Sequence, residues 1–209
     1  CELIGGDTTQ GPLNIAITVM GDTPQGQSIL RSGARVGDDL YVSGHLGDAR
    51  LALEAFRGQV SLPQAVFDIA RRRMECPTPR VALGQALRGI ANAMADISDG
   101  LLGDLGHILK ASRVGAQIEL PLTQTLMQTT DIWDCPADLF MTCVLSGGDD
   151  YELVFCAPAS ASAQVNAAAK ASGTRVTRIG RITESPNLVL LNEWGQSLHN
   201  PFRSFDHFA

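Results

Sequence analysis

Three aspartates, Asp96, Asp99 and Asp104, lie within nine residues of one another around an expected strand-to-helix junction. Asp96 ends a short apolar run, and Ser98 and Asp99 are residue types that commonly begin a helix. We therefore expect Asp96, Ser98 and Asp99 to project together at the end of a sheet. Such hard oxygen ligands suit Mg²⁺ carried in by a phosphate substrate. Taken alone, however, such a turn is more often a plain helix cap beside a solvated aspartate.

The helix after this junction is indicated by apolar residues that recur every three or four positions and give one apolar face. These residues are Leu101, Leu102, Leu105, Ile108 and Leu109. Gly100 lets the chain turn sharply into the first helical turn.

Two further turns combine glycine pairs with aspartate, one within residues 3–11 and one within residues 144–155. Glycine pairs let backbone N–H groups approach phosphate oxygens, and an adjacent acid can hold the bridging metal. Either turn by itself could be an ordinary hairpin. Three such turns at expected strand ends favour a metal and phosphate site.

These motifs, with several others, resemble bacterial thiamine-monophosphate kinase in order along the whole chain. The resemblance is carried by residues 3–9 (LIGGDTT), 31–34 (RSGA) with 37–38 (GD), 77–80 (PTPR), 96–101 (DISDGL), 146–153 (SGGDDYEL) and 205–208 (FDHF). The segments 96–101 and 5–8 also resemble the wider superfamily of aminoimidazole ribonucleotide synthetase and selenophosphate synthetase. The resemblance implies ATP-dependent phosphorylation of thiamine monophosphate to thiamine diphosphate, with ATP as co-substrate and several Mg²⁺ ions.

By motif position the resemblance also assigns roles to individual residues. The metal ligands are Asp7, Asp96 and Asp99; the ATP-binding residues are Gly6, Asp7, Arg31 and Ser98; the substrate-binding residues are Asp149 and Phe205. No catalytic residue beyond these is assigned, because phosphoryl transfer depends on positioning and charge neutralisation. Phe205 could equally be a tail residue that docks on the core.

The chain differs from the family pattern in two places. The chain opens at Cys1 inside a motif that the family carries well into its length. A preceding portion with further metal-holding acids is therefore expected to be missing, and this piece alone is expected to be inactive. Asp149 stands where the family usually has glutamate, which shortens the reach of that carboxylate by one methylene.

Composition excludes several other classes. The chain has 209 residues, a formal charge of −6 and 44% hydrophobic residues, without an apolar run near 18 residues. Neither nonspecific nucleic-acid binding nor membrane spanning is expected, and buried Cys143 and Cys156 suit a cytoplasmic protein. The basic run 71–73 is interpreted as a solvated helix face rather than a polyanion patch.

The mixture of strands and helices predicts an α+β fold, a layered α/β/α sandwich. The resemblance implies that its sheet is mixed, as in the C-terminal domain of the superfamily (PurM-like). Residues 1–24 are expected to end an N-terminal ATP- and metal-binding domain, with strands within 1–20, and residues 25–209 to form the C-terminal domain. Further strands are expected at 39–43, 116–120, 141–146, 151–156, 174–182 and 187–191, and helices from 47, at 62–74, 81–93 and near 160–172.

Two other functions remain open at this point. One is another ATP-using enzyme of the superfamily, of the aminoimidazole ribonucleotide synthetase or selenophosphate synthetase type. The other is a non-catalytic nucleotide-binding fragment. The sequence contains no Walker A motif, no Gly-x-Gly-x-x-Gly helix start and no Gly-x-Ser-x-Gly elbow, which argues against P-loop kinases, Rossmann dehydrogenases and α/β-hydrolases. A homodimer is expected for the complete enzyme.

Overall fold

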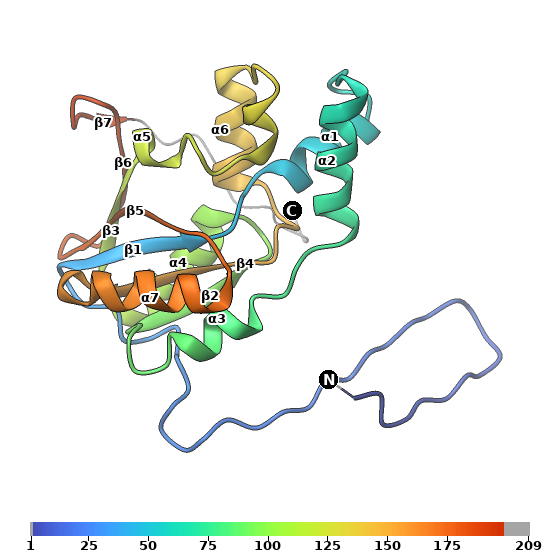
Figure 1. The fold of residues 1–209 in the computed structure, drawn as a ribbon, viewed down its shortest axis with the longest axis horizontal. Coiled ribbons are helices and arrows are strands. Elements are labelled where there is room, and N and C mark those ends of the chain that lie inside the picture. The colour runs from blue at the N-terminus through green and yellow to red at the C-terminus, as the bar shows by residue number, and fades with distance from the viewer. Residues whose placement is uncertain (1, 199–209) are drawn as a thin grey trace.

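A seven-stranded sheet in the order β2-β4-β1-β5-β3-β6-β7 carries the fold in the computed structural model, which describes residues 2–198 (Figure 1). The strands are β1 (Asp38–Ser43), β2 (Ala93–Ile97), β3 (Gly115–Glu119), β4 (Glu152–Pro158), β5 (Val176–Thr183), β6 (Leu188–Leu191) and β7 (Ser197–Leu198). Neighbouring strands are antiparallel except for β3 and β6, which are parallel. The sheet is therefore mixed, as expected.

Seven α-helices and two short 3-10 helices connect the described strands. They are α1 (Asp48–Phe56), α2 (Gln64–Glu75), α3 (Val81–Ala86), α4 (Leu101–Ser112), α5 (Leu120–Thr123), η1 (Gln128–Asp131), α6 (Ala137–Ser146), η2 (Ala159–Ala161) and α7 (Ser162–Ser172). Among the described residues, no helix is long and apolar enough to cross a membrane.

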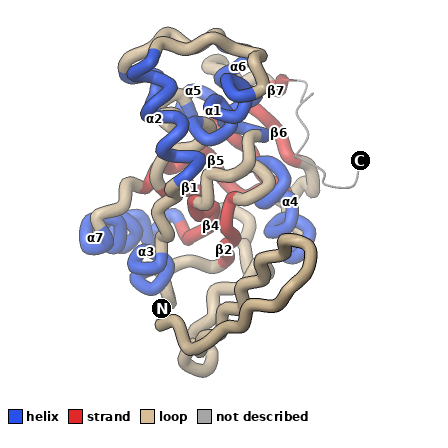
Figure 2. Tube along the Cα trace, turned by 90° about the vertical axis from the view of Figure 1, so that its right-hand side faces the viewer, coloured by secondary structure: helices blue, strands red, loops and turns tan. Residues whose placement is uncertain are grey.

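Helices cover both faces of the sheet because its central strands are buried on both sides. In β1, Leu40 and Val42 belong to the core formed with α1, α4 and α6. Tyr41, between them, faces the opposite core with α3 and α7 and stacks on Phe155, with ring centroids 5.2 Å apart. Figure 2 shows α3 and α7 on one side of the sheet and α4 on the other. The expected layered sandwich is confirmed.

The predicted apolar face of α4 is the face that the helix buries. Leu101, Leu105 and Ile108 are fully buried, and Leu102 and Leu109 are 7% exposed. Each leucine or isoleucine buried in this way contributes about 1.5–3 kcal/mol relative to an exposed side chain. This packing fixes the start of α4 against the end of β2.

Two predicted elements were wrong in type or length. Residues 141–146 form the end of helix α6 rather than a strand, because a short buried apolar run has no periodicity that separates the two. The helix predicted over 81–93 ends at Ala86, and Gly89 then adopts a φ of 72° in the turn that leads to β2. The other predicted strands and helices between 39 and 191 are confirmed within a few residues.

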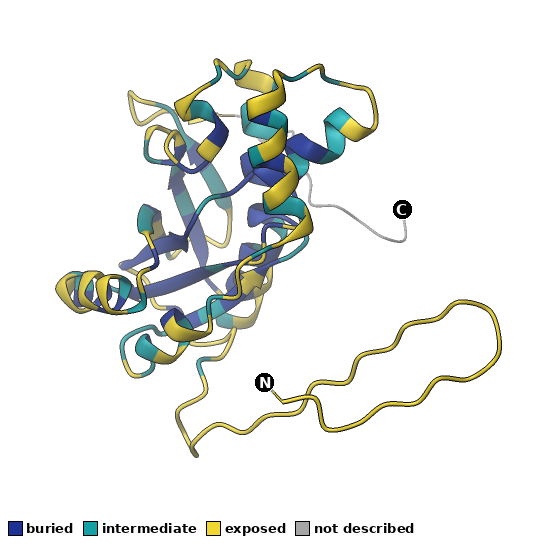
Figure 3. Ribbon diagram, turned by 45° about the vertical axis from the view of Figure 1, so that its right-hand side comes forward, coloured by how far each residue is buried: buried dark blue, intermediate teal, exposed yellow. Residues whose placement is uncertain are grey.

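The strands predicted within residues 1–20 are absent from the described residues. Residues 2–28 are all exposed and lie away from the body of the molecule (Figure 3). Leu13, Ile15, Ile17 and Val19 alternate as in a strand, yet they are 74–92% exposed. A strand needs a neighbour for its backbone hydrogen bonds, and no described strand pairs with this segment. The boundary proposed near residue 24 stays a prediction.

Candidate active site

Two of the three Gly/Asp turns meet at one end of the sheet because β2 and β4 are antiparallel neighbours. Ile97, which ends β2, pairs with Glu152, which begins β4. The turn before β4 is joined to the turn after β2 by two backbone hydrogen bonds. The N–H of Asp149 donates to the carbonyl of Ser98, and the N–H of Tyr151 to that of Ile97, each at 2.9 Å. The chain thereby brings Asp96, Ser98, Asp99 and Asp149 to the same edge.

Close backbone packing requires glycine at two positions of this junction. A Cβ on Gly148 would lie 2.5 Å from the carbonyl oxygen of Ser98. Gly100 has a φ of 111°, and a Cβ there would lie 2.9 Å from the carbonyl carbon of Ser146. Asp149 and Tyr151 also adopt positive φ, 67° and 51°, although neither is glycine. Such strained backbone persists where surrounding contacts enforce it, and it concentrates at functional sites.

Asp104 differs from the other two acids of the cluster because it is buried, at 3% exposure. Its carboxylate accepts the N–H groups of Ser98 and Asp99 at 2.9 and 3.0 Å. Burial raises the pKa of Asp104, and these two hydrogen bonds oppose that rise. The N-cap residue of α4 is Gly100, without a side-chain cap. Asp104 therefore holds the turn in shape, and Asp96 and Asp99 are left as candidate ligands.

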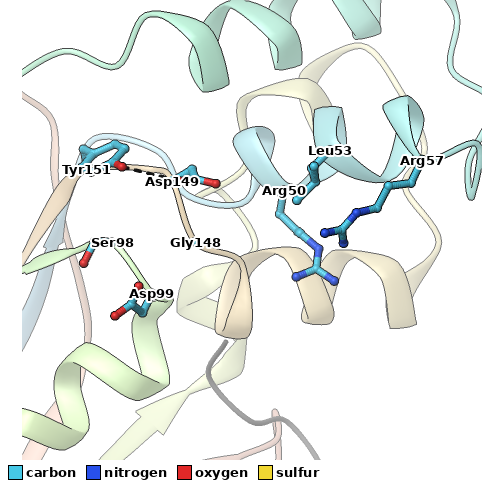
Figure 4. A pocket seen from close by; sticks show the side chains of 8 residues that line it. All are labelled: Arg50, Leu53, Arg57, Ser98, Asp99, Gly148, Asp149 and Tyr151. Carbon is cyan, nitrogen blue, oxygen red and sulfur yellow. Dashed lines mark hydrogen bonds between the residues drawn. The ribbon is translucent and has the colours of Figure 1, made fainter. Parts of the chain in front are cut away.

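A cavity of about 160 Å³ opens between the two turns and helix α1 (Figure 4). Its walls are Arg50, Leu53, Arg57, Ser98, Asp99, Gly148, Asp149 and Tyr151. Arg50 and Arg57 both approach Glu54, at 2.6 and 3.7 Å. Sequence reasoning missed these two arginines, because nothing in their spacing separates them from surface arginines on an amphipathic helix. They place positive charge opposite the two turns.

Tyr151 borders this cavity and a second one of about 490 Å³. The second cavity is lined by Pro77, Pro79, Arg80, Val81, Gly84, Asp96, Tyr151 and Leu153. The Tyr151 hydroxyl lies 3.5 Å from Oδ1 of Asp149. Burial first, and then the charges of Asp149, Asp99 and Asp96, raise the pKa of Tyr151. A mostly apolar cavity and a cavity lined by two aspartates and two arginines thus meet at Tyr151. The sequence showed Tyr151 only as part of a motif.

Behind Tyr151, a buried ion cluster anchors the start of β4. Glu152 is fully buried and accepts two hydrogen bonds from Arg80, both at 2.6 Å. Arg73 donates to it at 2.9 Å, and the Ser43 hydroxyl at 2.6 Å. The prediction that residues 71–73 form only a solvated face is therefore wrong for Arg73, whose side chain is 13% exposed.

The remaining predicted site residues fall in different places. Arg31 approaches Asp96 at 3.9 Å, and both side chains are about half exposed. Gly6 and Asp7 lie in the exposed segment, where Asp7 accepts the N–H of Thr8 at 2.8 Å. The structure does not bring these two residues to the Asp96 turn. Phe205 lies outside the described residues.

The described residues fit magnesium only when a phosphate supplies further ligands. Among residues 2–198, no group of three His, Cys, Asp or Glu side chains could hold a metal ion. Asp96 and Asp99 do supply hard oxygen atoms at an accessible edge. Magnesium is commonly held by one or two carboxylates together with substrate phosphates and water. Asp96 and Asp99 are two such carboxylates.

A family model described as AIR synthase related protein, C-terminal domain, matches residues 35–191. The chain belongs to this family.

Its sequence relatives include thiamine-monophosphate kinases. The one from Escherichia coli K12 is 37% identical over 212 residues, and the one from Salmonella typhimurium is 40% identical over 213 residues. Both alignments cover 100% of this chain and 64% of the relative, so the chain spans somewhat less than two thirds of their length.

Solved structures similar to this chain also include a thiamine-monophosphate kinase. Thiamine-monophosphate kinase from Stenotrophomonas maltophilia is 36% identical with a TM-score of 0.73, over 83% of this chain and 55% of that one. The structure of AaThiL complexed with AMPPCP and TMP is 28% identical with a TM-score of 0.66, over 86% of this chain and 54% of that one.

Proposed function

We propose that this chain takes part in the ATP-dependent phosphorylation of thiamine monophosphate to thiamine diphosphate. One observation carries the proposal. Asp96, Ser98, Asp99 and Asp149 meet at one sheet edge in a chain that is 37% identical to a thiamine-monophosphate kinase. A solved relative in complex with AMPPCP and TMP supports both substrates. The chain's residues have the chemistry to hold phosphates and a charged ring.

The nucleotide side of the proposed site is built from Asp96, Ser98, Asp99 and Arg31. Asp96 and Asp99 would hold Mg²⁺, and the bound metal would neutralise charge on the phosphates. The Ser98 hydroxyl is a donor for a phosphate oxygen. Arg31, already near Asp96, offers a guanidinium for a charge-assisted hydrogen bond to phosphate. Because phosphoryl transfer depends on positioning and charge neutralisation, no covalent enzyme intermediate is required.

The acceptor side of the proposed site is built from Asp149, Tyr151 and the apolar cavity beside them. Pro77, Pro79 and Leu153 give that cavity surfaces that suit an aromatic ring. The negative Asp149, in the wall of the neighbouring cavity that shares Tyr151, favours a cationic thiazolium. Phe205 remains a proposed stacking residue for the same ring.

Gly6 and Asp7 remain proposed ATP and metal ligands, which requires the N-terminal segment to lie differently in the active protein. A homodimer and a cytoplasmic location are likewise proposals. They rest on the resemblance to bacterial kinases.

The proposed reaction is tested by joining this chain to the portion of the Escherichia coli relative that it does not match. The joined protein is supplied with ATP and Mg²⁺, and products are followed by ³¹P NMR. Thiamine diphosphate should form from thiamine monophosphate, whereas aminoimidazole precursors and selenide should not be phosphorylated. Turnover of either alternative acceptor in preference to thiamine monophosphate would reject the proposal.

A further inference from the structure

A third cavity, of about 340 Å³, lies on the other side of Arg80 from the apolar one. Its walls come from α2, the segment after it, the turn after β1 and the start of η1: His45, Ile69, Arg72, Arg73, Cys76, Thr78, Arg80 and Gln128. We call it the arginine pocket. It shares no residue with the cavity between Ser98 and Asp149.

The arginine pocket carries more positive than negative charge. Arg72, Arg73 and Arg80 lie in its wall, and the buried Glu152 is the ion-pair partner of both Arg73 and Arg80. Glu152 thus pairs with two of the three guanidinium groups and leaves Arg72 without a carboxylate partner among the described residues. Asp150, the other acid near Arg73, is fully buried, and burial raises its pKa well above the ordinary value. Its carboxylate accepts the N–H of Gly47 and forms no ion pair with an arginine among the described residues.

Two of these guanidinium groups have donors without acceptors. The Arg72 guanidinium forms no hydrogen bond or ion pair with any residue in 2–198, and Arg72 is exposed at the pocket. Nε of Arg73 is buried, again without a partner among those residues. A buried donor without an acceptor costs free energy. If the cluster only stabilised the fold, the ion pairs of Glu152 with Arg73 and Arg80 would suffice. They do not account for the Arg72 guanidinium or for Nε of Arg73.

His45 adds a second observation at the same pocket. Its ring nitrogen Nε2 lies 3.2 Å from Nη1 of Arg175. The charged groups that face it are Arg175 before β5, Asp48 on α1, Arg73 on α2 and Glu152 on β4. Burial, followed by the charge of Arg175, lowers the pKa of His45. Because the His45 imidazole is partly buried among cations, an anion that enters the pocket should change its ring signals and its pKa.

We propose that the arginine pocket binds a phosphate dianion, either inorganic phosphate or the phosphate group of a phosphomonoester. Guanidinium groups bind phosphate oxygens through paired, charge-assisted hydrogen bonds. Thr78 and Gln128 supply neutral polar groups in the same wall. The cavity also leaves room for a small organic substituent beside the phosphate. This inference is independent of the proposed kinase function.

The test follows the His45 ring by NMR while inorganic phosphate is added to the full chain at constant ionic strength maintained with chloride. Arg72→Gln removes the unpaired guanidinium. Arg71→Gln removes the same charge one residue earlier, where Arg71 pairs with Glu75 and its side chain is 50% exposed. Wild type and Arg71→Gln should show a saturable shift. Arg72→Gln should weaken the phosphate affinity about tenfold, since it removes a charge-assisted contact.

Phosphate should also raise the pKa of His45, whereas the ring signals of exposed His107 on α4 should not shift. Competition with glycerol 2-phosphate separates the two sources: tighter binding of the ester identifies a phosphomonoester, and weaker binding identifies the free anion. The proposal is overturned when shifts are not saturable, when they appear equally at His107, or when Arg72→Gln responds as the wild type does. Arg72 is exposed, so thermal melts should show all variants equally folded.

Discussion

At the scale of single residues, neighbouring acids in one turn differ in burial and therefore in role. Asp149 is exposed at the candidate site, Asp150 is fully buried, and Glu152 is buried in an ion cluster. Asp149 and Tyr151, both with positive φ, line the cavity, whereas Asp150 and Glu152 are buried. The buried acids hold the backbone that presents the exposed one.

Glu152 should be the most costly of these acids to neutralise. Glu152→Gln leaves Arg73 and Arg80, whose side chains are only 13% and 15% exposed, without their carboxylate. We expect a loss of about 3–5 kcal/mol in the free energy of unfolding, because a broken buried pair leaves uncompensated charge. Urea denaturation measures it. Glu75→Gln, which breaks an exposed pair with Arg71, is the control and should cost at most about 1 kcal/mol. If Glu152→Gln lowered the free energy of unfolding no more than Glu75→Gln does, the buried cluster would not be stabilising.

Asp150 should make the protein less stable as the pH rises. Its pKa is raised in the folded state mainly by burial, whereas the unfolded side chain has its ordinary value of 3.8. Between these two values the folded state holds a proton that the unfolded state releases, so the free energy of unfolding falls with increasing pH. Asp150→Asn, which resembles the protonated acid and can still accept the Gly47 N–H, should flatten this decline. Melting curves across pH 4–8 measure it, and an unchanged slope would contradict the assignment.

At the scale of elements, the site depends on how β2, α4 and the turn before β4 fit together. Hydrogen bonds between the turns and the packing of α4 leave no space at Gly100. The same helix contains Gly106, where an added Cβ would meet nothing within 4 Å.

These two glycines give opposite predictions for the same substitution. Gly100→Ala should destabilise the protein by more than about 1 kcal/mol, since alanine must adopt a positive φ and press on Ser146. Gly106→Ala should stabilise it by about 0.5–1 kcal/mol, since alanine favours the helix interior. Thermal unfolding compares them. A Gly100→Ala variant as stable as the wild type would show that this junction adjusts freely.

The strand-to-helix junction could be predicted from the sequence because periodicity and turn residues agreed there. Leu101 to Leu109 showed one apolar face, and Ser98-Asp99-Gly100 marked its start. The segment 141–146 offered no such agreement, because residues 143–146 are buried in succession and a short apolar run of this kind fits a helix or a strand.

The candidate site could be predicted only in part, because its second half comes from residues distant in the chain. The motifs named Asp96, Ser98, Asp99 and Asp149, which the pairing of β2 and β4 brings together. Arg50, Arg57 and the burial of Arg73 depend on how α1 and α2 pack, which no local pattern encodes.

At the scale of the whole molecule, the described fold supplies the exposed Asp96 and the half-buried Asp99 but no complete metal site. No group of three potential ligands exists among residues 2–198, and the kinase relatives are longer than this chain. The exposed segment with Asp7 has no neighbour in the body.

The 209-residue chain alone should therefore show no conversion of thiamine monophosphate with ATP and Mg²⁺. Joining it to the unmatched portion of the Escherichia coli relative should produce turnover. Chromatographic detection of thiamine diphosphate compares the two proteins at equal concentration. Robust turnover by the isolated chain would show that its own acids suffice.

The most direct test of the account is Mg²⁺-dependent turnover by Asp96→Asn and Asp99→Asn in the joined protein. Asp68→Asn, which removes an exposed carboxylate that contacts only Gln64 through a described hydrogen bond, is the control. If Asp96 and Asp99 hold the metal, each variant should lose at least about 100-fold in rate. The unfolding free energy of Asp96→Asn should stay within about 0.5 kcal/mol of the control, because the ion pair between Asp96 and Arg31 is exposed and 3.9 Å long. Rates within twofold of the control for both variants would contradict the account.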